Sequence, residues 1–142
     1  VALVDNEVNL NDETITLVNL DVNCGSTRHP KISVKIDYKG KIIEKIESGN
    51  GPVDSIFKAI NSVIKNNAKL ELFQIHAVTK GTDAQAEVTV RLNEKGLSVN
   101  GLASDTDTMV ASANAYIVAL NKLIEKRKKR TSGIGISSST NY

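Results

Sequence analysis

The chain has no tryptophan, one cysteine, one methionine and two prolines among its 142 residues, and aromatic residues make up only 4%. The single cysteine, Cys24, excludes an internal disulfide and favours a reducing, cytoplasmic compartment. No apolar run approaches the roughly 20 residues that a membrane-spanning helix needs, so we expect no membrane partner. Hydrophobic residues at 40% and charged residues at 24% exclude collagen-like and wholly disordered chains. The length predicts one domain with its own core.

Residue types that support catalysis or metal binding are scarce. There are two histidines, His29 and His76, and no Cys-x-x-Cys, His-x-His or glycine-rich phosphate loop. We therefore expect this segment alone to be non-catalytic, with no catalytic residue, metal or cofactor. Asp105 and Asp107 could be interpreted as a metal pair, but two carboxylates at a helix start are typical of capping. His76 lies in the apolar stretch QIHAV, which favours a core or interface histidine over a ligand.

Positive charge is concentrated in one segment near the end of the chain. The formal net charge is +2, yet Lys122–Arg130 alone has six basic residues and one acidic residue. Basic residues at a helix end interact favourably with the helix dipole, and no aromatic residue interleaves them, so we expect no nucleic-acid partner. Binding through Lys126–Arg130 stays open as an alternative. The Ser/Gly-rich segment 131–142 is predicted to be a flexible tail.

The chain contains an internal repeat. Lys31–Gly40 (KISVKIDYKG) aligns without a gap with Glu87–Gly96 (EVTVRLNEKG), a shift of 56 residues from 31 to 87. Ala59 matches Ala115 at the same shift, and Ile64 matches Leu120 further along the helices. Two copies of one supersecondary unit are the simplest explanation.

Each copy predicts three strands followed by one helix. In Lys31–Gly40 and Glu87–Gly96, apolar and polar residues alternate with the period of two that is typical of a half-buried strand. The glycine that ends each stretch supplies the positive φ of a tight hairpin into a third strand. Apolar residues then recur every three or four positions, over 53–64 and 109–123, which predicts two amphipathic helices. We expect an α+β fold of two pseudo-symmetric βββα units, each an antiparallel three-stranded sheet with one helix.

The segment GNGPVD, residues 49–54, is the strongest candidate for ligand binding. Its two glycines flank Asn50 directly before a helix whose first turn suits Pro52. Glycines let the backbone approach a small ligand closely, and the free N–H groups of a first helical turn can receive a carboxylate. The same segment is also compatible with an ordinary strand-to-helix turn.

Three longer stretches, in their order and spacing, carry a family resemblance. GNGPVDSIFKAIN, LELFQIHAVTKGTDAQAEVTVRL and DTDTMVASANAYIVALNKL together resemble the C-terminal regulatory domain of 2-isopropylmalate synthase and its relatives, often called the LeuA dimerisation or allosteric domain. The resemblance covers about residues 14–130. It implies a linker from an absent catalytic domain over residues 1–13, repeat one over 14–66 and repeat two over 70–130. The family's domain is built from two βββα units, in agreement with the repeat.

The resemblance also implies a function. In the parent enzyme, a TIM-barrel domain, expected to use a divalent metal, condenses acetyl-CoA with 2-oxoisovalerate in leucine biosynthesis. The regulatory domain binds L-leucine for feedback inhibition and mediates a homodimer. The positions here that match the family's leucine contacts are Asn50, Gly51, Val53, Asp54, Leu70, Phe73, Ala77, Ala84, Ala86 and Thr108.

These positions have different expected roles. The helix start at Gly51 suits the leucine carboxylate, and Asp54 is a candidate partner for its ammonium group. Leu70 and Phe73 would form part of the pocket wall, whereas the alanines leave room for a branched side chain. Core packing is the alternative for Val53, Leu70 and the alanines. Two functional alternatives also stay open, namely the isoleucine-sensing domain of citramalate synthase and a dimerisation module without a ligand.

Overall fold

The computed structural model describes residues 14–23, 31–64, 66–80 and 83–140. Within them, each half of the chain forms an antiparallel three-stranded sheet followed by a helix, which confirms the predicted α+β fold. The first half contains β1 (Ile15–Asn23), β2 (Lys31–Tyr38), β3 (Lys41–Ser48) and α2 (Pro52–Val63). The second half contains β4 (Lys69–Lys80), β5 (Asp83–Glu94), β6 (Leu97–Asp105) and α3 (Thr108–Thr140).

Both β2–β3 and β5–β6 are joined by tight turns at the predicted glycines. Gly40 has φ 77° and Gly96 has φ 82°, and the lysine before each also has positive φ, 56° at Lys39 and 52° at Lys95. Two consecutive residues with positive φ are the signature of a type I′ turn, whose twist matches that of the flanking strands. The repeat therefore extends to the backbone conformation of its hairpins.

The middle strand of each sheet supplies much of the core. Over residues 32–36 of β2 and 88–92 of β5 every second side chain is fully buried, and the residues between them are polar and at least partly exposed. Burying an aliphatic side chain of this size stabilises the fold by about 1.5–3 kcal/mol. The six buried residues are Ile32, Val34, Ile36, Val88, Val90 and Leu92.

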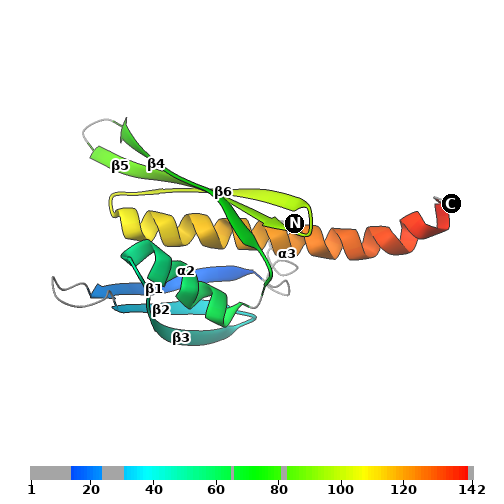
Figure 1. The fold of residues 1–142 in the computed structure, drawn as a ribbon, viewed down its shortest axis with the longest axis horizontal. Helices are drawn as coiled ribbons and strands as arrows, with labels where there is room; N and C mark the ends of the chain where they lie inside the picture. Colours follow the sequence, from blue (N-terminus) through cyan, green and yellow to red (C-terminus); the bar gives the residue numbers. More distant parts are fainter. Residues whose placement is uncertain (1–13, 24–30, 65, 81–82, 141–142) are drawn as a thin grey trace, which may run out of the picture.

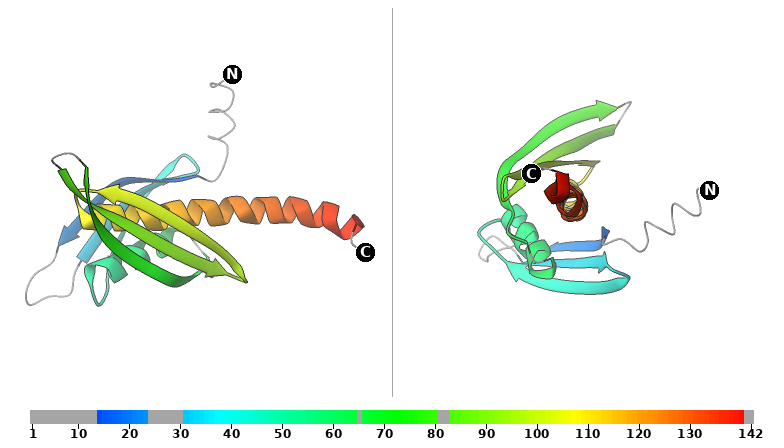
Figure 2. Two further views of the ribbon diagram at one scale, coloured as in Figure 1. Left: turned by 90° about the horizontal axis from the view of Figure 1, so that it is seen from above. Right: turned by 90° about the vertical axis from the view of Figure 1, so that its right-hand side faces the viewer.

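The two helices lie between the two sheets, so the molecule has a sheet on each outer side (Figure 1). Helix α2 packs on β2 and β3, and α3 packs on β5 and β6 of its own half. Helix α3 also contacts β1 of the other half, and α2 contacts α3. The end-on view in Figure 2 shows α3 lying between the two sheets, with α2 beside it and its other side open. The halves therefore share one core.

Helix α3 approaches β6 most closely at Gly101. A Cβ atom at this position would overlap the backbone oxygen of Ala115 and lie 2.6 Å from the backbone nitrogen of Ala119. Because both atoms belong to the helix backbone, no side-chain rotation can relieve the overlap. Gly101 is therefore required by the contact between strand and helix rather than by its own φ.

Helix α3 is longer than the sequence pattern predicts. Its apolar periodicity ends near Leu123, and Gly133 and Gly135 disfavour a helix by about 1 kcal/mol each, yet the helix continues to Thr140. The mobility of segment 131–142 stays a prediction. Within the described ranges no helix is long and apolar enough to cross a membrane. Cys24, His29 and the predicted linker 1–13 lie outside the described residues.

Candidate functional site

The GNGP turn leads from β3 into α2 with no side chain capping the helix. Gly51 is the N-cap residue, with extended backbone at φ −157°, and Pro52 follows in the first turn. The backbone oxygen of Gly51 accepts hydrogen bonds from the Ser55 backbone nitrogen at 2.9 Å and the Ser55 hydroxyl at 2.8 Å. A Cβ atom on Gly51 would meet nothing within 4 Å. Open space therefore lies above this glycine, as close approach of a ligand requires.

Gly49 serves a different purpose from Gly51. A Cβ atom at Gly49 would come within 2.5 Å of Oδ2 of Asp54 and 2.8 Å of the Ser55 hydroxyl. The absence of a side chain lets the carboxylate of Asp54 fold back over the turn, where Oδ2 accepts a hydrogen bond from the Asn50 backbone nitrogen at 3.2 Å. The missing side chain at Gly49 thus lets the Asp54 carboxylate bond across the turn. The missing side chain at Gly51 leaves the backbone open to approach from outside.

Asp54 also forms a weak ion pair. Its Oδ2 lies 3.8 Å from Nζ of Lys58, one helical turn further on, and both side chains are about half exposed. An exposed pair of this kind contributes about 0–1 kcal/mol. A ligand ammonium group could replace Lys58 at little cost.

An aromatic cluster connects α2 to the second half of the chain. The ring of Phe57 stacks on Tyr116 of α3, with centroids 4.3 Å apart, and meets Phe73 of β4 edge-on at 5.8 Å. The Tyr116 hydroxyl donates to Oδ1 of Asn61 at 2.7 Å, and burial raises the pKa of Tyr116 above its ordinary value. Phe73 and Val53 are both partly buried against the core, so core packing accounts for part of their role.

Small side chains line the far end of the β4–β5 hairpin. Ala77 lies opposite Ala86 in the ladder, and Ala84 lies opposite Thr79. Strand alternation places these residues on the same face as Phe73, which is the face turned toward the helices. Ala77 and Ala84 are exposed and Ala86 is half-buried. This end of the hairpin therefore presents a shallow apolar surface.

Most of the predicted site residues lie toward one end of the molecule. Both α2 and α3 begin there, and the tip of the β4–β5 hairpin points to the same end (Figure 1). Thr108 opens α3, close in sequence to Asp105, which pairs with Ala86. Leu70 is the exception, because it pairs with Leu92 near the other end of β4, about 23 Å along the strand from Ala77.

Asp107 caps the start of α3, and Asp105 supports the turn that leads into it. Oδ1 of Asp107 accepts a hydrogen bond from the Met109 backbone nitrogen, and Oδ1 of Asp105 accepts one from the Asp107 backbone nitrogen, each at 2.8 Å. This confirms the capping interpretation. Among the described residues, no group of three or more His, Cys, Asp or Glu could hold a metal ion.

His76 is not a core histidine. It is exposed and pairs with Glu87 on the outer face of the second sheet. Its neighbours Ile75 and Ala77 are apolar because they occupy the opposite face of the strand. The interface interpretation of His76 stays a prediction.

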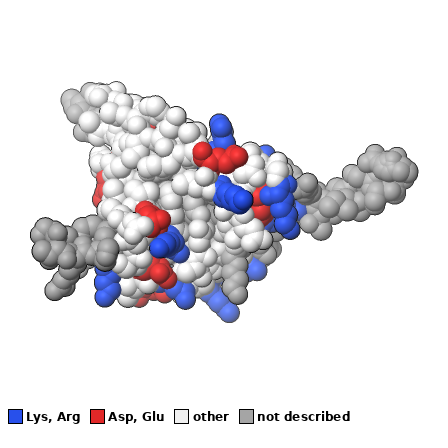
Figure 3. Space-filling view, viewed as in Figure 1, with Lys and Arg blue, Asp and Glu red and all other residues white. Residues whose placement is uncertain are grey.

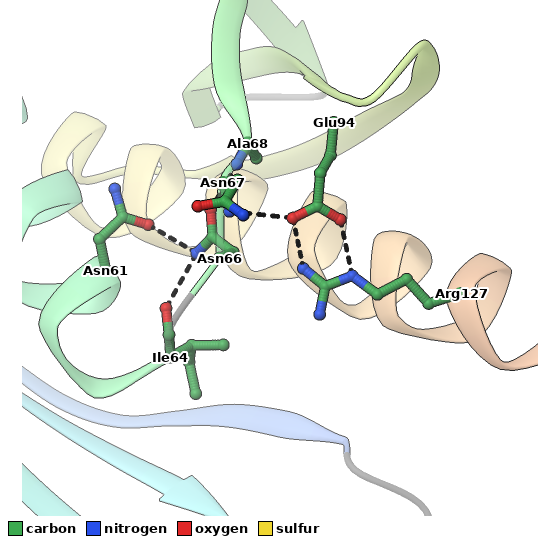
Figure 4. A network of polar contacts seen from close by, with 7 residues as sticks. All are labelled: Asn61, Ile64, Asn66, Asn67, Ala68, Glu94 and Arg127. Atoms are coloured by element: carbon green, nitrogen blue, oxygen red, sulfur yellow. Dashed lines mark hydrogen bonds and ion pairs between the residues drawn. The ribbon is translucent and has the colours of Figure 1, made fainter.

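A polar network links three parts of the molecule (Figure 4). They are the segment between α2 and β4, the second sheet and helix α3. Glu94 is nearly buried, and its carboxylate accepts two hydrogen bonds of 2.7 Å from Arg127 and one of 2.9 Å from the Asn67 backbone nitrogen. Burial by itself would raise the pKa of Glu94, but the hydrogen bonds from Arg127 and Asn67 outweigh it and hold the pKa below its usual value. Glu94 thus joins Asn67, just before β4, to Arg127 of α3.

β4 is an edge strand with an apolar face that α3 leaves largely open. The sheet order is β4-β5-β6, and α3 packs on β5 and β6. On the face turned toward the helices, Ile75 is 45% exposed and Leu70 is 47% exposed. In Figure 3 the described surface at the upper left, over the outer part of the β4–β5 hairpin, shows few charged side chains, whereas charged side chains lie at the centre, at the right and over the first sheet.

Sequence reasoning missed three residues next to the site: Phe57, Ile75 and Tyr116. The alternation of Phe73, Ile75 and Ala77 along β4 could have identified Ile75 as part of the same face. Phe57 and Tyr116 look like ordinary core positions of two helices, and only the packing of the helices against each other brings their rings into contact.

Two βββα repeats with their helices packed between the sheets define a duplicated α+β domain. A family model described as the LeuA allosteric (dimerisation) domain matches residues 1–124. The chain therefore belongs to this family.

Curated relatives agree with the family match. The chain is 49% identical over 128 residues to a 2-isopropylmalate synthase of Rhodopseudomonas palustris (strain BisA53), covering 90% of this chain and 25% of that protein. It is 48% identical over 130 residues to the 2-isopropylmalate synthase of Bradyrhizobium diazoefficiens, covering 92% and 25% of the two chains. The chain thus spans about a quarter of the length of the curated relatives it matches.

Proposed function

We propose that this chain is the regulatory domain of a cytoplasmic 2-isopropylmalate synthase, where it binds L-leucine for feedback inhibition and mediates dimerisation. The family match and relatives of that name support the parent enzyme. The condensation of acetyl-CoA with 2-oxoisovalerate, and the divalent metal expected for it, would belong to a catalytic domain outside this chain. Occupancy of the regulatory domain would restrain that domain through linkage.

One observation best supports an amino-acid effector. The starts of both helices and the alanine-lined tip of the β4–β5 hairpin lie at the same end of the molecule. An amino acid has an anionic group, a cationic group and an apolar side chain, and this end offers a partner for each. The open backbone at Gly51 and the start of α2 suit the carboxylate, and Asp54 suits the ammonium group. The apolar surface of Ile75, Ala77 and Ala86 suits a branched side chain.

A second copy of the chain would complete this site. The open apolar face of β4 needs cover, and the family is described as a dimerisation domain. A dimer through this face would turn the shallow surface into an enclosed pocket. It would also place Leu70 against the partner, which gives this distant residue a role.

The basic run Lys126–Arg130 gains little support as a nucleic-acid surface. Nζ of Lys126 donates to the backbone oxygen of Ser98 at 3.2 Å, and Arg127 is held by Glu94. Both residues therefore serve contacts inside the domain.

Isothermal titration of the full-length enzyme with L-leucine, L-isoleucine and L-valine tests the proposal. We expect leucine to bind, and Asp54→Ala to weaken binding at least about tenfold, because a charged hydrogen bond contributes about 1.5–3 kcal/mol. Lys58→Ala is the matched control and should leave binding unchanged or slightly tighter, because it removes only an exposed competitor for the Asp54 carboxylate. Preference for isoleucine would point to citramalate synthesis, and absence of binding would leave a dimerisation module.

A further inference from the structure

Asn121 in α3 holds the first residue of β1 by two hydrogen bonds. The Ile15 backbone nitrogen donates to Oδ1 of Asn121 at 2.7 Å, and Nδ2 of Asn121 donates to the Ile15 backbone oxygen at 2.9 Å. The two residues are 106 positions apart in the sequence. Ile15 is only 2% exposed, so this contact lies at the edge of the core.

The amide of Asn121 acts as a one-residue strand partner. β1 is the edge strand of its sheet, in the order β1-β2-β3, and Ile15 pairs with Tyr38 on its other side. A side-chain amide offers one donor and one acceptor, which match the N–H and C=O of one residue. The N-terminal end of β1 is thereby anchored to α3.

Helix α3 is in turn fixed to both halves of the domain. Tyr116 bonds to Asn61 of α2, Arg127 bonds to Glu94 of β5, and Gly101 lets β6 lie against the helix backbone. From Thr108 at the start of α3 to Asn121 is about 20 Å along the helix axis. A rigid helix can carry a displacement over this distance without a change in its own structure.

We infer that Asn121 is a positioning residue that couples the effector site to the segment preceding Ile15. This inference rests on the proposed function and on the expectation that residues 1–13 lead to the catalytic domain. A ligand that shifts the start of α3 also shifts Asn121, and Asn121 moves the backbone of Ile15 with it. Breaking the two hydrogen bonds should therefore separate leucine binding from inhibition.

Asn121→Ala in the full-length enzyme tests this coupling, with leucine affinity and the ratio of activities without and with saturating leucine measured on the same preparation. We expect the dissociation constant to stay within about threefold of wild type and the activity ratio to fall to less than about twofold, from the 5- to 150-fold typical of allosteric coupling. Hydrogen exchange of the Ile15 amide should quicken at least about tenfold in the variant. Lys122→Ala, at the exposed neighbouring position, is the control and should retain full inhibition.

The outcomes separate the inference from the proposed function. If Asn121→Ala binds leucine and is inhibited as strongly as wild type, the coupling role is wrong. Loss of leucine binding in the variant alone would also overturn it, because Asn121 would then belong to the binding structure. Absence of binding in wild type would instead refute the proposed function. Asn121→Asp keeps the acceptor for the Ile15 N–H and loses the donor to the Ile15 oxygen. It should therefore show partial loss of inhibition with leucine binding retained. This variant replaces Asn121→Ala if the alanine variant does not fold.

Discussion

Arg127 and Glu94 form a bidentate ion pair, in which Nε and Nη2 of the arginine each lie 2.7 Å from a different oxygen of the carboxylate. Glu94 lies at the end of β5 and Arg127 in α3, so the pair joins sheet and helix. Asn67, which precedes β4, donates its backbone N–H to the same carboxylate. One side chain of β5 thus contacts both α3 and the connection between the halves.

Arg127→Met should destabilise the chain by about 2 kcal/mol. The substitution leaves Glu94 nearly buried with only the Asn67 N–H as partner, and an unpaired buried charge typically costs about 3–5 kcal/mol. We lower that figure because the Arg127 side chain is 39% exposed and solvent screens the pair. Chemical denaturation measures the loss. Lys126→Met is the control, and an equal loss in both variants would contradict a specific role of the ion pair.

The stability that Glu94 contributes should depend on pH. Its pKa in the folded state lies below the ordinary value of 4.5, so the contribution is complete above about pH 4.5 and is lost as the pH falls through the folded-state pKa. Wild type should therefore be more stable than Glu94→Gln at pH 7, and the difference should narrow as the pH falls below 4.5. Thermal melting over a series of pH values measures this difference. A gap that does not narrow in acid would show that the carboxylate charge is not responsible.

Gly101→Ala should destabilise the chain by about 3 kcal/mol, the upper end of the range for overpacking. The new methyl group would overlap backbone atoms of Ala115 and Ala119, so α3 would have to move away from β6. Ser104→Ala, at an exposed position of the same strand, is the control. Denaturation midpoints of the two variants should differ clearly, and similar midpoints would mean that the helix adjusts at little cost.

The sequence predicts the local structure of this chain better than its long-range contacts. Alternation along β2 and β5 and the glycines at 40 and 96 are local signals, and they predict the strands and hairpins correctly. No local signal predicts that position 101 must be glycine. Glycine is required there because the backbone of α3, distant in sequence, packs directly on it. In the sequence, Glu94 is an ordinary residue of a hairpin and Arg127 is one member of a basic run. Their ion pair depends on the fold and cannot be predicted from either local pattern.

In the candidate site, too, the sequence predicts local features better than long-range contacts. The GNGP turn and the caps of α3 are local patterns, and the structure contains both where the sequence places them. The distance of Leu70 from the other site residues, the contact of Phe57 with Tyr116 and the outward position of His76 depend on strand register and helix packing. An apolar neighbourhood in sequence therefore misled the interpretation of His76.

Gly51→Ser should weaken leucine binding without destabilising the domain. Serine is a favoured N-cap residue, and the extended backbone at φ −157° accepts any residue, so stability should be equal to or slightly above wild type. The added side chain would occupy the open space above the turn, where we place the ligand carboxylate. Thermal melting together with leucine titration checks both parts. Unchanged affinity in a stable variant would move the carboxylate away from this turn.

Ile75→Asp should dissociate the proposed dimer while leaving the monomer folded. Ile75 is 45% exposed on the open face of β4, so a charge there costs little in a monomer but would be buried without a partner in an interface. Leu102→Asp is the matched control, because Leu102 is 54% exposed on the outer face of the same sheet. Sedimentation of the two variants at equal concentration measures their oligomeric state. We expect monomers for Ile75→Asp and dimers for Leu102→Asp, and the reverse result would place the interface on the outer face.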